Sequence, residues 1–179
     1  MRAHLPRRER PAWRPRREGA AALEFAIVAT PFFFLIFAVM ELALVFVVDS
    51  VLENATLNAS RLVRTGQADH ENISADAFRS SLCADMGVLS ANCESRTDID
   101  VRVIPQFRAA PPPDPIVDGV LDESTLTYLP GDPGSLVLIR VWYSQPLVTP
   151  FLSSALSRLN SGDAVLSIAT AFRNEPYDG

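Results

Sequence analysis

The residues best placed to do chemistry lie at the start of a long apolar run, where a carboxylate follows a basic head and a glycine. Gly19 is followed by the small residues Ala20–Ala22, and Glu24 stands directly before Phe25. A carboxylate inside a membrane helix costs about 2.5–3.5 kcal/mol on insertion scales, so its presence there indicates a function. The pattern predicts a protein that is processed and then packed against its neighbours in the bilayer.

Cysteine and histidine are the other reactive side chains, and each occurs only twice. Cys83 and Cys93 are close in sequence, whereas His4 lies in the basic head and His70 in a polar stretch. Two thiols and two distant imidazoles cannot supply the closed four-ligand set of a structural zinc site. We expect a Cys83–Cys93 disulfide if this part of the chain lies outside the cytoplasm, and two reduced, buried cysteines otherwise.

Motifs and charge argue against several classes of protein. No G-x-S-x-G, phosphate-binding loop or metal-ligand spacing occurs in the sequence, so we predict no catalytic residue, no cofactor and no metal. Residues 1–18 carry seven Arg against two Glu, whereas the rest of the chain has nine Arg and nineteen acidic residues. A nucleic-acid-binding domain would show a basic face, so we expect no nucleic acid as a partner.

A membrane-spanning helix is the element that must position the carboxylate near the basic head. No charged residue occurs over residues 25–40, and after Glu41 the apolar run continues to Val48. At 1.5 Å per residue this run rises about 36 Å, enough to cross a hydrocarbon core of about 30 Å with some tilt. We assign residues 20–48 to a transmembrane helix and expect a kink at Pro31, because proline removes a backbone donor.

Charges on either side of the span predict its orientation. Seven Arg precede it, whereas Asp49 and Glu53 follow at once. The positive-inside rule therefore places the head in the cytoplasm and residues 49–179 outside. A cleaved secretory signal peptide is the alternative, but its apolar region is usually 7–15 residues long and ends at a small-residue site. Val47-Val48-Asp49 is a poor site of that kind, so we expect the span to be retained.

The helix is predicted to continue beyond the membrane over residues 49–66. One face is apolar at steps of three and four residues, and another carries a polar stripe. The apolar face is Val48, Leu52, Ala55, Ala59 and Leu62, and the polar stripe is Asp49, Glu53, Thr56 and Ser60. Gly66 is the expected stop. The small alanines fit close packing against a sheet or a partner helix, and packing on the chain's own domain is the simpler expectation.

The remaining sequence predicts an α+β domain over residues 67–179. The expected elements are a helix over residues 74–88 with Ser74 as N-cap, strands over 99–107, 135–144 and 165–172, a proline-rich loop over 109–115, a turn over 130–134 and a short helix or lid over 150–160. A sheet of three or four strands needs a covering element. We therefore predict a long N-terminal helix packed on a small, mostly antiparallel sheet, with 135–144 as its central strand.

The start of the chain resembles a type IV prepilin, and more closely the TadE-like minor pseudopilins of the tight-adherence (Tad) pilus. Prepilins share a basic leader, a glycine at the cut and an acid five residues later, which here are Gly19 and Glu24. Phe25 matches the aromatic that follows the acid in Tad-type prepilins, and Pro31 and residues 55–66 are also similar. The resemblance implies a pilin-like fold.

The resemblance also implies how the chain is processed and where it works. A prepilin peptidase would cut the Gly19–Ala20 bond at the cytoplasmic face and remove the leader, residues 1–19. Glu24, followed by Phe25, would then meet the N-terminal ammonium of a neighbouring subunit. The implied role is a minor pseudopilin that assembles or anchors an adhesion pilus of the kind used in biofilms. The implied partners are other minor pseudopilins, the major pilin and an inner-membrane assembly platform, with the C-terminal domain in the bacterial periplasm or carried into the extracellular pilus.

Several alternatives stay open at this point. An uncleaved chain would be a single-pass, membrane-anchored periplasmic scaffold or sensor. A major pilin is disfavoured, because removing the leader from 179 residues leaves 160 and major Tad pilins are much shorter. Glu24 would otherwise be an interfacial carboxylate favoured by the helix macrodipole. Glu41 departs from the family pattern, since Leu42-Ala43-Leu44 follows it where the family often has Gly and Arg, and its role is left unassigned.

Overall fold

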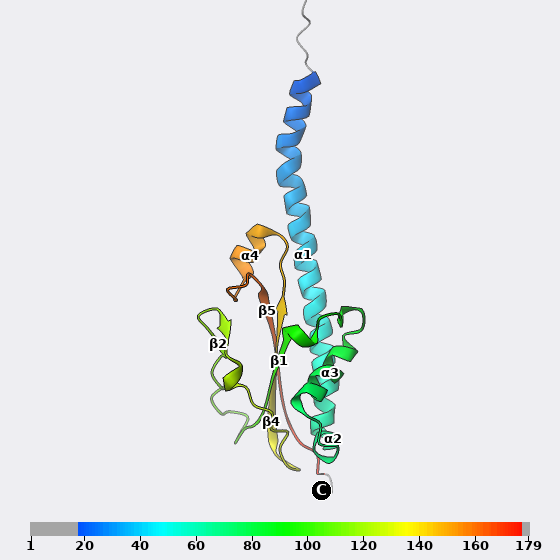
Figure 1. Cartoon of the computed structure of the whole chain (residues 1–179), viewed down its shortest axis with the longest axis vertical. Helices are drawn as coiled ribbons and strands as arrows, with labels where there is room; N and C mark the ends of the chain where they lie inside the picture. The colour runs from blue at the N-terminus through cyan, green and yellow to red at the C-terminus, as the bar shows by residue number, and fades with distance from the viewer. Residues whose placement is uncertain (1–17, 177–179) are drawn as a thin grey trace, which may run out of the picture. The chain divides into compact units, whose positions relative to one another are not determined.

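The computed structural model describes residues 18–176 of the chain, drawn in colour in Figure 1. Residues 1–17, which hold all seven Arg of the predicted basic leader 1–19, lie outside the described residues. The helices are α1 (Glu18–Arg64), α2 (Gln67–His70), α3 (Ala75–Asp85) and α4 (Pro150–Leu156), and the strands are β1 (Thr97–Val103), β2 (Ile116–Val117), β3 (Val120–Leu121), β4 (Leu136–Gln145) and β5 (Ala164–Arg173). Single 3-10 turns lie at Gly87–Leu89, Glu94–Arg96 and Glu123–Thr125. The chain forms two compact units, residues 1–37 and residues 38–179.

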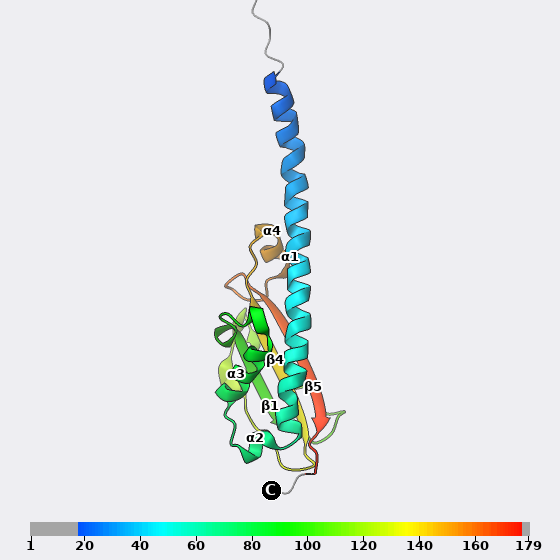
Figure 2. The same cartoon turned by 90° about the vertical axis from the view of Figure 1, so that its right-hand side faces the viewer.

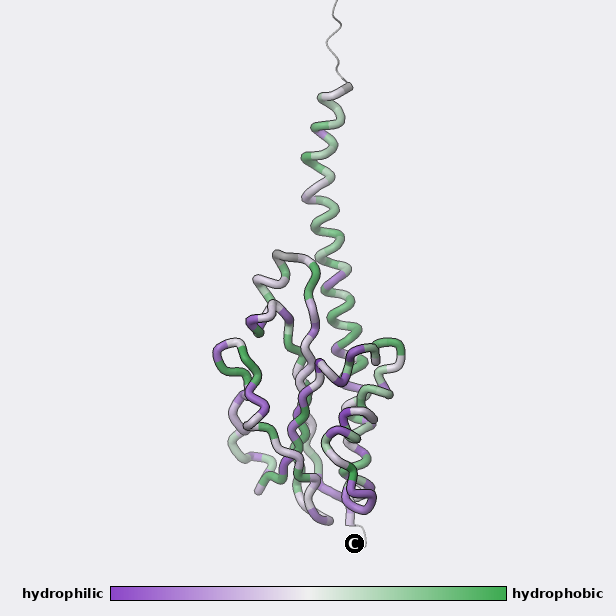
Figure 3. The backbone as a smooth tube through the Cα atoms, in the orientation of Figure 1, coloured by the Kyte–Doolittle hydropathy of each residue, from purple (hydrophilic) through white to green (hydrophobic). Residues whose placement is uncertain are grey.

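The described part of the first unit is the beginning of α1, and apart from Glu18 and Glu24 it carries no charged residue. Side chains from Leu23 to Phe37 are mostly exposed, and Figure 3 shows this part of the helix in the green of hydrophobic residues. The most apolar 18-residue window of α1 has a mean hydropathy of 2.6, so length and composition make α1 a candidate membrane span. The helix runs through Pro31 without interruption.

A three-stranded antiparallel sheet in the order β1-β4-β5 lies at the centre of the second unit. The predicted antiparallel pairing and the central place of β4 are confirmed, with Val101 opposite Ile139 and Ile139 opposite Thr170. β1 begins two residues earlier than predicted and ends at Val103 instead of residue 107. It ends there because Pro105, two residues on, has no N–H to donate to a ladder.

The C-terminal part of α1 and α3 cover one face of this sheet, as Figures 1 and 2 show. α1 buries the predicted apolar face, except that Leu62 is half-buried and Val63 takes the last core position. Thr56 and Ser60, expected in the polar stripe, are also buried. The reason is geometric: a helix in a groove buries more than one narrow row, and short hydroxyl side chains fit where the backbones approach closely.

Local sequence signals end and begin the helices as predicted. α1 ends at Arg64, and Gly66 follows with φ of 79° while its N–H donates to the Val63 carbonyl at 3.1 Å. Ser74 caps α3, because its Oγ accepts the Ala77 N–H at 3.2 Å. α3 ends at Asp85, earlier than predicted. The expected short helix after β4 is present as α4.

The segment between β1 and β4, residues 104–135, covers the second face of the sheet over β1 and β4, whereas Ser167, Ala169 and Ala171 of β5 stay exposed. It contains the predicted proline-rich loop and a small β2–β3 hairpin that was not predicted. The hairpin turns at Asp118 and Gly119, which both have positive φ (50° and 76°), as a type I′ turn requires. Asp-Gly between apolar pairs is a strong hairpin signal, so the sequence did contain the information.

Candidate functional site

The predicted cleavage site lies in the first turn of α1. Gly19 is exposed, and a β-carbon placed on it would meet no atom within 4 Å. Ala20 is exposed too, so nothing in residues 18–176 covers the bond between them. The first N–H groups of a helix have no intrahelical partner, so unwinding this turn into a peptidase cleft breaks few hydrogen bonds. No described residue therefore blocks access to the Gly19–Ala20 bond.

Glu24 lies one helical turn after Ala20, on the same side of α1. Its side chain is exposed, and its neighbours Leu23 and Phe25 are 63% and 70% exposed. Among residues 18–176, no side chain forms a hydrogen bond or an ion pair with the Glu24 carboxylate. A charge in an apolar medium is expensive unless it is paired. The arrangement thus leaves one exposed carboxylate, with an aromatic beside it, without a partner among residues 18–176.

Glu41, which the sequence left unassigned, has a partner far away in the chain. Its carboxylate accepts the backbone N–H of Thr149 at 2.9 Å and also that of Val148. Thr149 is the N-cap residue of α4, so the carboxylate lies where an anion is favoured by the helix end. Glu41 thereby ties α1 to the loop between β4 and α4.

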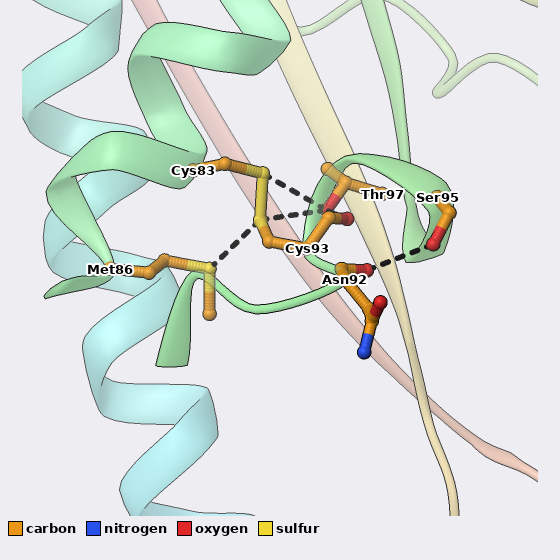
Figure 4. The surroundings of a disulfide bond; sticks show 6 residues. All are labelled: Cys83, Met86, Asn92, Cys93, Ser95 and Thr97. Carbon is orange, nitrogen blue, oxygen red and sulfur yellow. Dashed lines mark hydrogen bonds between the residues drawn. A yellow bond between two sulfur atoms is a disulfide. The ribbon is translucent and has the colours of Figure 1, made fainter. Parts of the chain in front are cut away.

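A disulfide joins Cys83 near the end of α3 to Cys93 before β1, and both residues are buried. Figure 4 shows the bond with Met86 and Thr97 around it. The Thr97 hydroxyl donates to the Cys93 carbonyl at 2.8 Å, and the Met86 sulfur lies 3.3 Å from the Cys93 sulfur. Because a disulfide sulfur carries no proton, the contact between these two sulfurs is van der Waals packing. The bond fixes the end of α3 to the start of the sheet.

The most strongly connected polar group, Asp100, was not predicted from the sequence, where it alternates with Ile99 and Val101 as a solvent-facing residue would. Asp100 is fully buried between two arginines on the sheet's second face. Arg102 donates to it at 2.7 Å from Nε, and Arg140 at 3.0 Å from Nε and 2.9 Å from Nη2. The N–H and the hydroxyl of Thr127 also donate to the Asp100 carboxylate, at 3.0 and 3.1 Å. The sequence signal that could have indicated this cluster is Arg140, a lone arginine in the apolar run of β4, which the strand register places opposite Asp100.

Arg140 connects this cluster to the proline-rich loop. Its Nη1 donates to the carbonyls of Pro112 and Pro113 at 3.1 and 3.0 Å, and its guanidinium carbon lies 4.8 Å from the centre of the Trp142 ring. Proline has no N–H, so these carbonyls are what the loop can offer to a side chain. The Asp100 cluster therefore holds the loop on the sheet. The guanidinium groups of Arg102 and Arg140 donate to other groups of this chain.

Electrostatics agree with a charged, permanently paired Asp100. Burial by itself raises the pKa of this carboxyl, but hydrogen bonds from Arg102, the Thr127 N–H and Arg140 outweigh it and bring the pKa below its usual range. On the same strand, burial and the nearby Glu123 raise the pKa of Asp98. The two neighbouring acids are thus shifted in opposite directions by their surroundings.

Beside the cluster an open hollow of about 220 Å³ is lined by Asp114, Arg140, Trp142 and Arg158, among others. Small-molecule sites usually have volumes of about 300–1,000 Å³. Arg158 donates to Asp114 at 2.6 Å, and Arg140 is occupied by Asp100. The charged groups that line this hollow are thus paired within the described chain. Residues 18–176 contain no group of three or more His, Cys, Asp or Glu side chains placed to hold a metal ion.

Comparison with known proteins identifies the N-terminal part of the chain. Residues 19–61 match the family model described as TadE-like protein. The match includes the predicted cleavage site, Glu24 and Glu41, and it ends before the sheet; it confirms the predicted resemblance over that segment. The chain matches none of the curated proteins and none of the solved structures with which it was compared.

Proposed function

We propose that this protein, whose residues 19–61 form a TadE-like segment, is a minor pseudopilin that serves the assembly or anchoring of a Tad-type adhesion pilus. The observation that carries the proposal is the family match, because it spans the glycine, the acid and the apolar helix together. The α+β unit of residues 38–179 gives the chain a folded domain beyond its helix. Such a domain suits a specialised component better than the repeating body of a fibre.

Processing by a prepilin peptidase follows from the same segment. The proposed cut breaks the bond between Gly19 and Ala20 and releases the leader, residues 1–19. Gly19 is exposed and lacks a side chain, which favours entry into a narrow cleft. The Arg-rich head would hold the site at the cytoplasmic surface, near anionic lipid.

Glu24 is proposed to set the register between subunits. Cleavage frees an ammonium at Ala20, four residues before Glu24, and a neighbouring subunit shifted along the helix axis would bring that ammonium to the carboxylate. Both charges are expensive alone in an apolar core, and pairing removes much of that penalty. The pair would therefore favour one register of neighbouring helices over others instead of simply adding stability.

A periplasmic location for the folded unit is supported by the buried Cys83–Cys93 disulfide. Structural disulfides persist in oxidising compartments such as the bacterial periplasm and are rare in the cytosol. The positive-inside rule predicts the same side independently, from the Arg-rich head. The proposed partners are the peptidase, other pseudopilins, the major pilin and the inner-membrane assembly platform.

The decisive experiment is to measure the intact mass and the N-terminal sequence of the membrane-extracted protein from its native host. We expect an N-terminus at Ala20, lost when the host's prepilin peptidase gene is deleted. Gly19→Val, which places a branched side chain at the cut, should give the same uncleaved product in the wild-type host. Retention of residue 1 in a wild-type host would contradict processing and favour the permanently anchored scaffold or sensor.

A further inference from the structure

The contact between Glu41 and the loop before α4 shows which part of α1 lies beside that loop. Both partners belong to the unit of residues 38–179, and Figures 1 and 2 show α4 beside α1 at the end of the sheet. The Glu41 carboxylate accepts the Thr149 N–H at 2.9 Å and that of Val148. Whatever surrounds α1 at Glu41 therefore also surrounds the loop between β4 and α4.

That loop cannot lie in hydrocarbon. Residues 146–149 are neither helix nor strand. The Glu41 carboxylate accepts the N–H groups of Val148 and Thr149, but the Leu147 N–H and the carbonyls of Leu147 and Val148 have no hydrogen-bond partner among the described residues. Lipid-exposed irregular backbone does not occur within the hydrocarbon core, because each unsatisfied group there costs several kcal/mol. The core must therefore end before Glu41, and not at Val48 as the apolar run alone predicts.

The length of helix that remains agrees with this limit. From Ala20 to Met40 there are 21 residues, and Glu24 is the only charged one. At 1.5 Å per residue they rise about 31 Å, which matches a hydrocarbon core of about 30 Å. After Glu41 one side of the helix packs on the folded unit, since Val48 is buried and Val45 is half-buried, while Phe46 and Val47 stay 70% and 53% exposed.

Composition separates the α4 region from the rest of the folded unit's surface. No charged residue occurs from Val141 to Ser157, although the unit is acidic overall. Val148, whose backbone N–H donates to Glu41, is 87% exposed, and Leu156 on α4 is 40% exposed. An uncharged surface with protruding aliphatic side chains fits the headgroup boundary of a bilayer.

We infer that the loop Pro146–Thr149 and α4 form a membrane-contact surface on the outer leaflet, and that the hydrocarbon span of α1 is residues 20–40. The partner is the lipid surface itself, with Val148 reaching toward the acyl boundary. Glu41 lies just above this boundary, where its two backbone donors keep the carboxylate satisfied. The inference requires α1 to span a membrane but does not require pilus assembly.

The test places one fluorescent label at a time on the full chain in vesicles of phosphatidylcholine and phosphatidylglycerol, at high lipid dilution. Cys83 and Cys93 are bonded and buried, so an added cysteine is the only reactive thiol. An environment-sensitive dye is attached at Val148→Cys, and quenching is compared for lipids carrying a nitroxide near the headgroup or near the chain end. Val88→Cys is the matched control, because Val88 is 97% exposed on the 3-10 turn after α3.

We expect quenching at Val148→Cys by the shallow nitroxide to exceed that at Val88→Cys several-fold, with weaker quenching by the deep one. Equal, weak quenching at both positions would overturn the inference, and so would stronger deep quenching at position 148. Leu35→Cys, in the apolar part of α1, reports insertion separately and should respond to the deep nitroxide. Failure at position 35 would reject the anchor on which both proposals rest, whereas failure at position 148 alone leaves the proposed pilus function untouched. If Val148→Cys does not fold, Leu156→Cys supplies the same measurement.

Discussion

Asp100 and Arg140 stand directly opposite each other on β1 and β4, and two hydrogen bonds of 3.0 and 2.9 Å join their side chains. The same aspartate accepts from Arg102, and the same arginine reaches two proline carbonyls of the covering loop. One buried carboxylate thus connects two strands and a segment that has little regular structure of its own. We therefore expect the packing of residues 104–135 on the sheet to depend on this pair.

Replacing Asp100 by alanine should destabilise the folded unit by about 3 kcal/mol or more, because it leaves two guanidinium groups without their buried partner. Thermal unfolding of the detergent-solubilised protein, followed by tryptophan fluorescence, to which Trp142 on β4 contributes, measures this. Asp114→Ala is the matched control, since its pair with Arg158 is about half exposed on both sides and should be worth about 1 kcal/mol or less. Equal losses for the two variants would contradict the assigned role of Asp100.

Acid should weaken the wild-type protein through the same carboxyl. The pKa of Asp100 lies below its usual range, so the unfolded chain binds this proton more readily than the folded chain does. The stabilisation is complete above the unfolded value of about 3.9 and is lost as the pH falls through the lower folded value. Asp98, with a raised pKa, contributes with the opposite sign. The difference in unfolding free energy between wild type and Asp100→Asn should therefore shrink below about pH 4, whereas a constant difference would refute the linkage.

Removing the disulfide should cost about 2–3 kcal/mol, the value expected for closing a loop of about ten residues. The double variant Cys83→Ser, Cys93→Ser avoids leaving a single thiol. Its thermal midpoint should fall below that of the oxidised wild type and should not respond to reductant. A wild-type midpoint equal to that of the double variant would contradict a stabilising role for the bond.

Thr56→Val should stabilise the protein by about 1 kcal/mol. The Thr56 hydroxyl is fully buried in α1 and has no hydrogen-bond partner within the described residues, so it carries a desolvation penalty. Valine keeps the shape without the hydroxyl. Ser60→Ala makes a useful comparison, because the Ser60 hydroxyl donates to the Leu57 carbonyl at 2.7 Å and its loss should not stabilise. Denaturant midpoints of both variants decide the point.

Glu24→Ala should insert into the membrane and be cleaved normally but fail to enter pili. The reason is that the carboxylate has no partner in the described chain and is proposed to pair only with a neighbour. Immunoblots of membranes and of sheared pili from the native host separate the two steps. Glu53→Gln, an exposed acid further along α1, is the control and should be incorporated as the wild type. Normal incorporation of Glu24→Ala into pili would contradict the proposed pairing between Glu24 and a neighbouring subunit.

Features that depend on neighbouring residues could be predicted from the sequence. The run of β-formers at β4, the Ser74 cap and the stop at Gly66 each need only a few adjacent side chains, and the structure confirms them. The amphipathic half of α1 also followed from spacing, because a helix repeats its face every 3.6 residues. The β2–β3 hairpin was missed although its Asp-Gly turn is local.

Only the tertiary structure decided which polar groups meet. Asp100 alternates with apolar residues as a solvent-facing residue would, yet residues 104–135 fold over that face and bury it. Glu41 finds its donors more than a hundred residues away, and that contact limits how far the membrane helix can extend. Local spacing sets which face of an element a side chain occupies, but what covers that face depends on strand register and long-range packing. A short stretch of sequence encodes neither of these by itself.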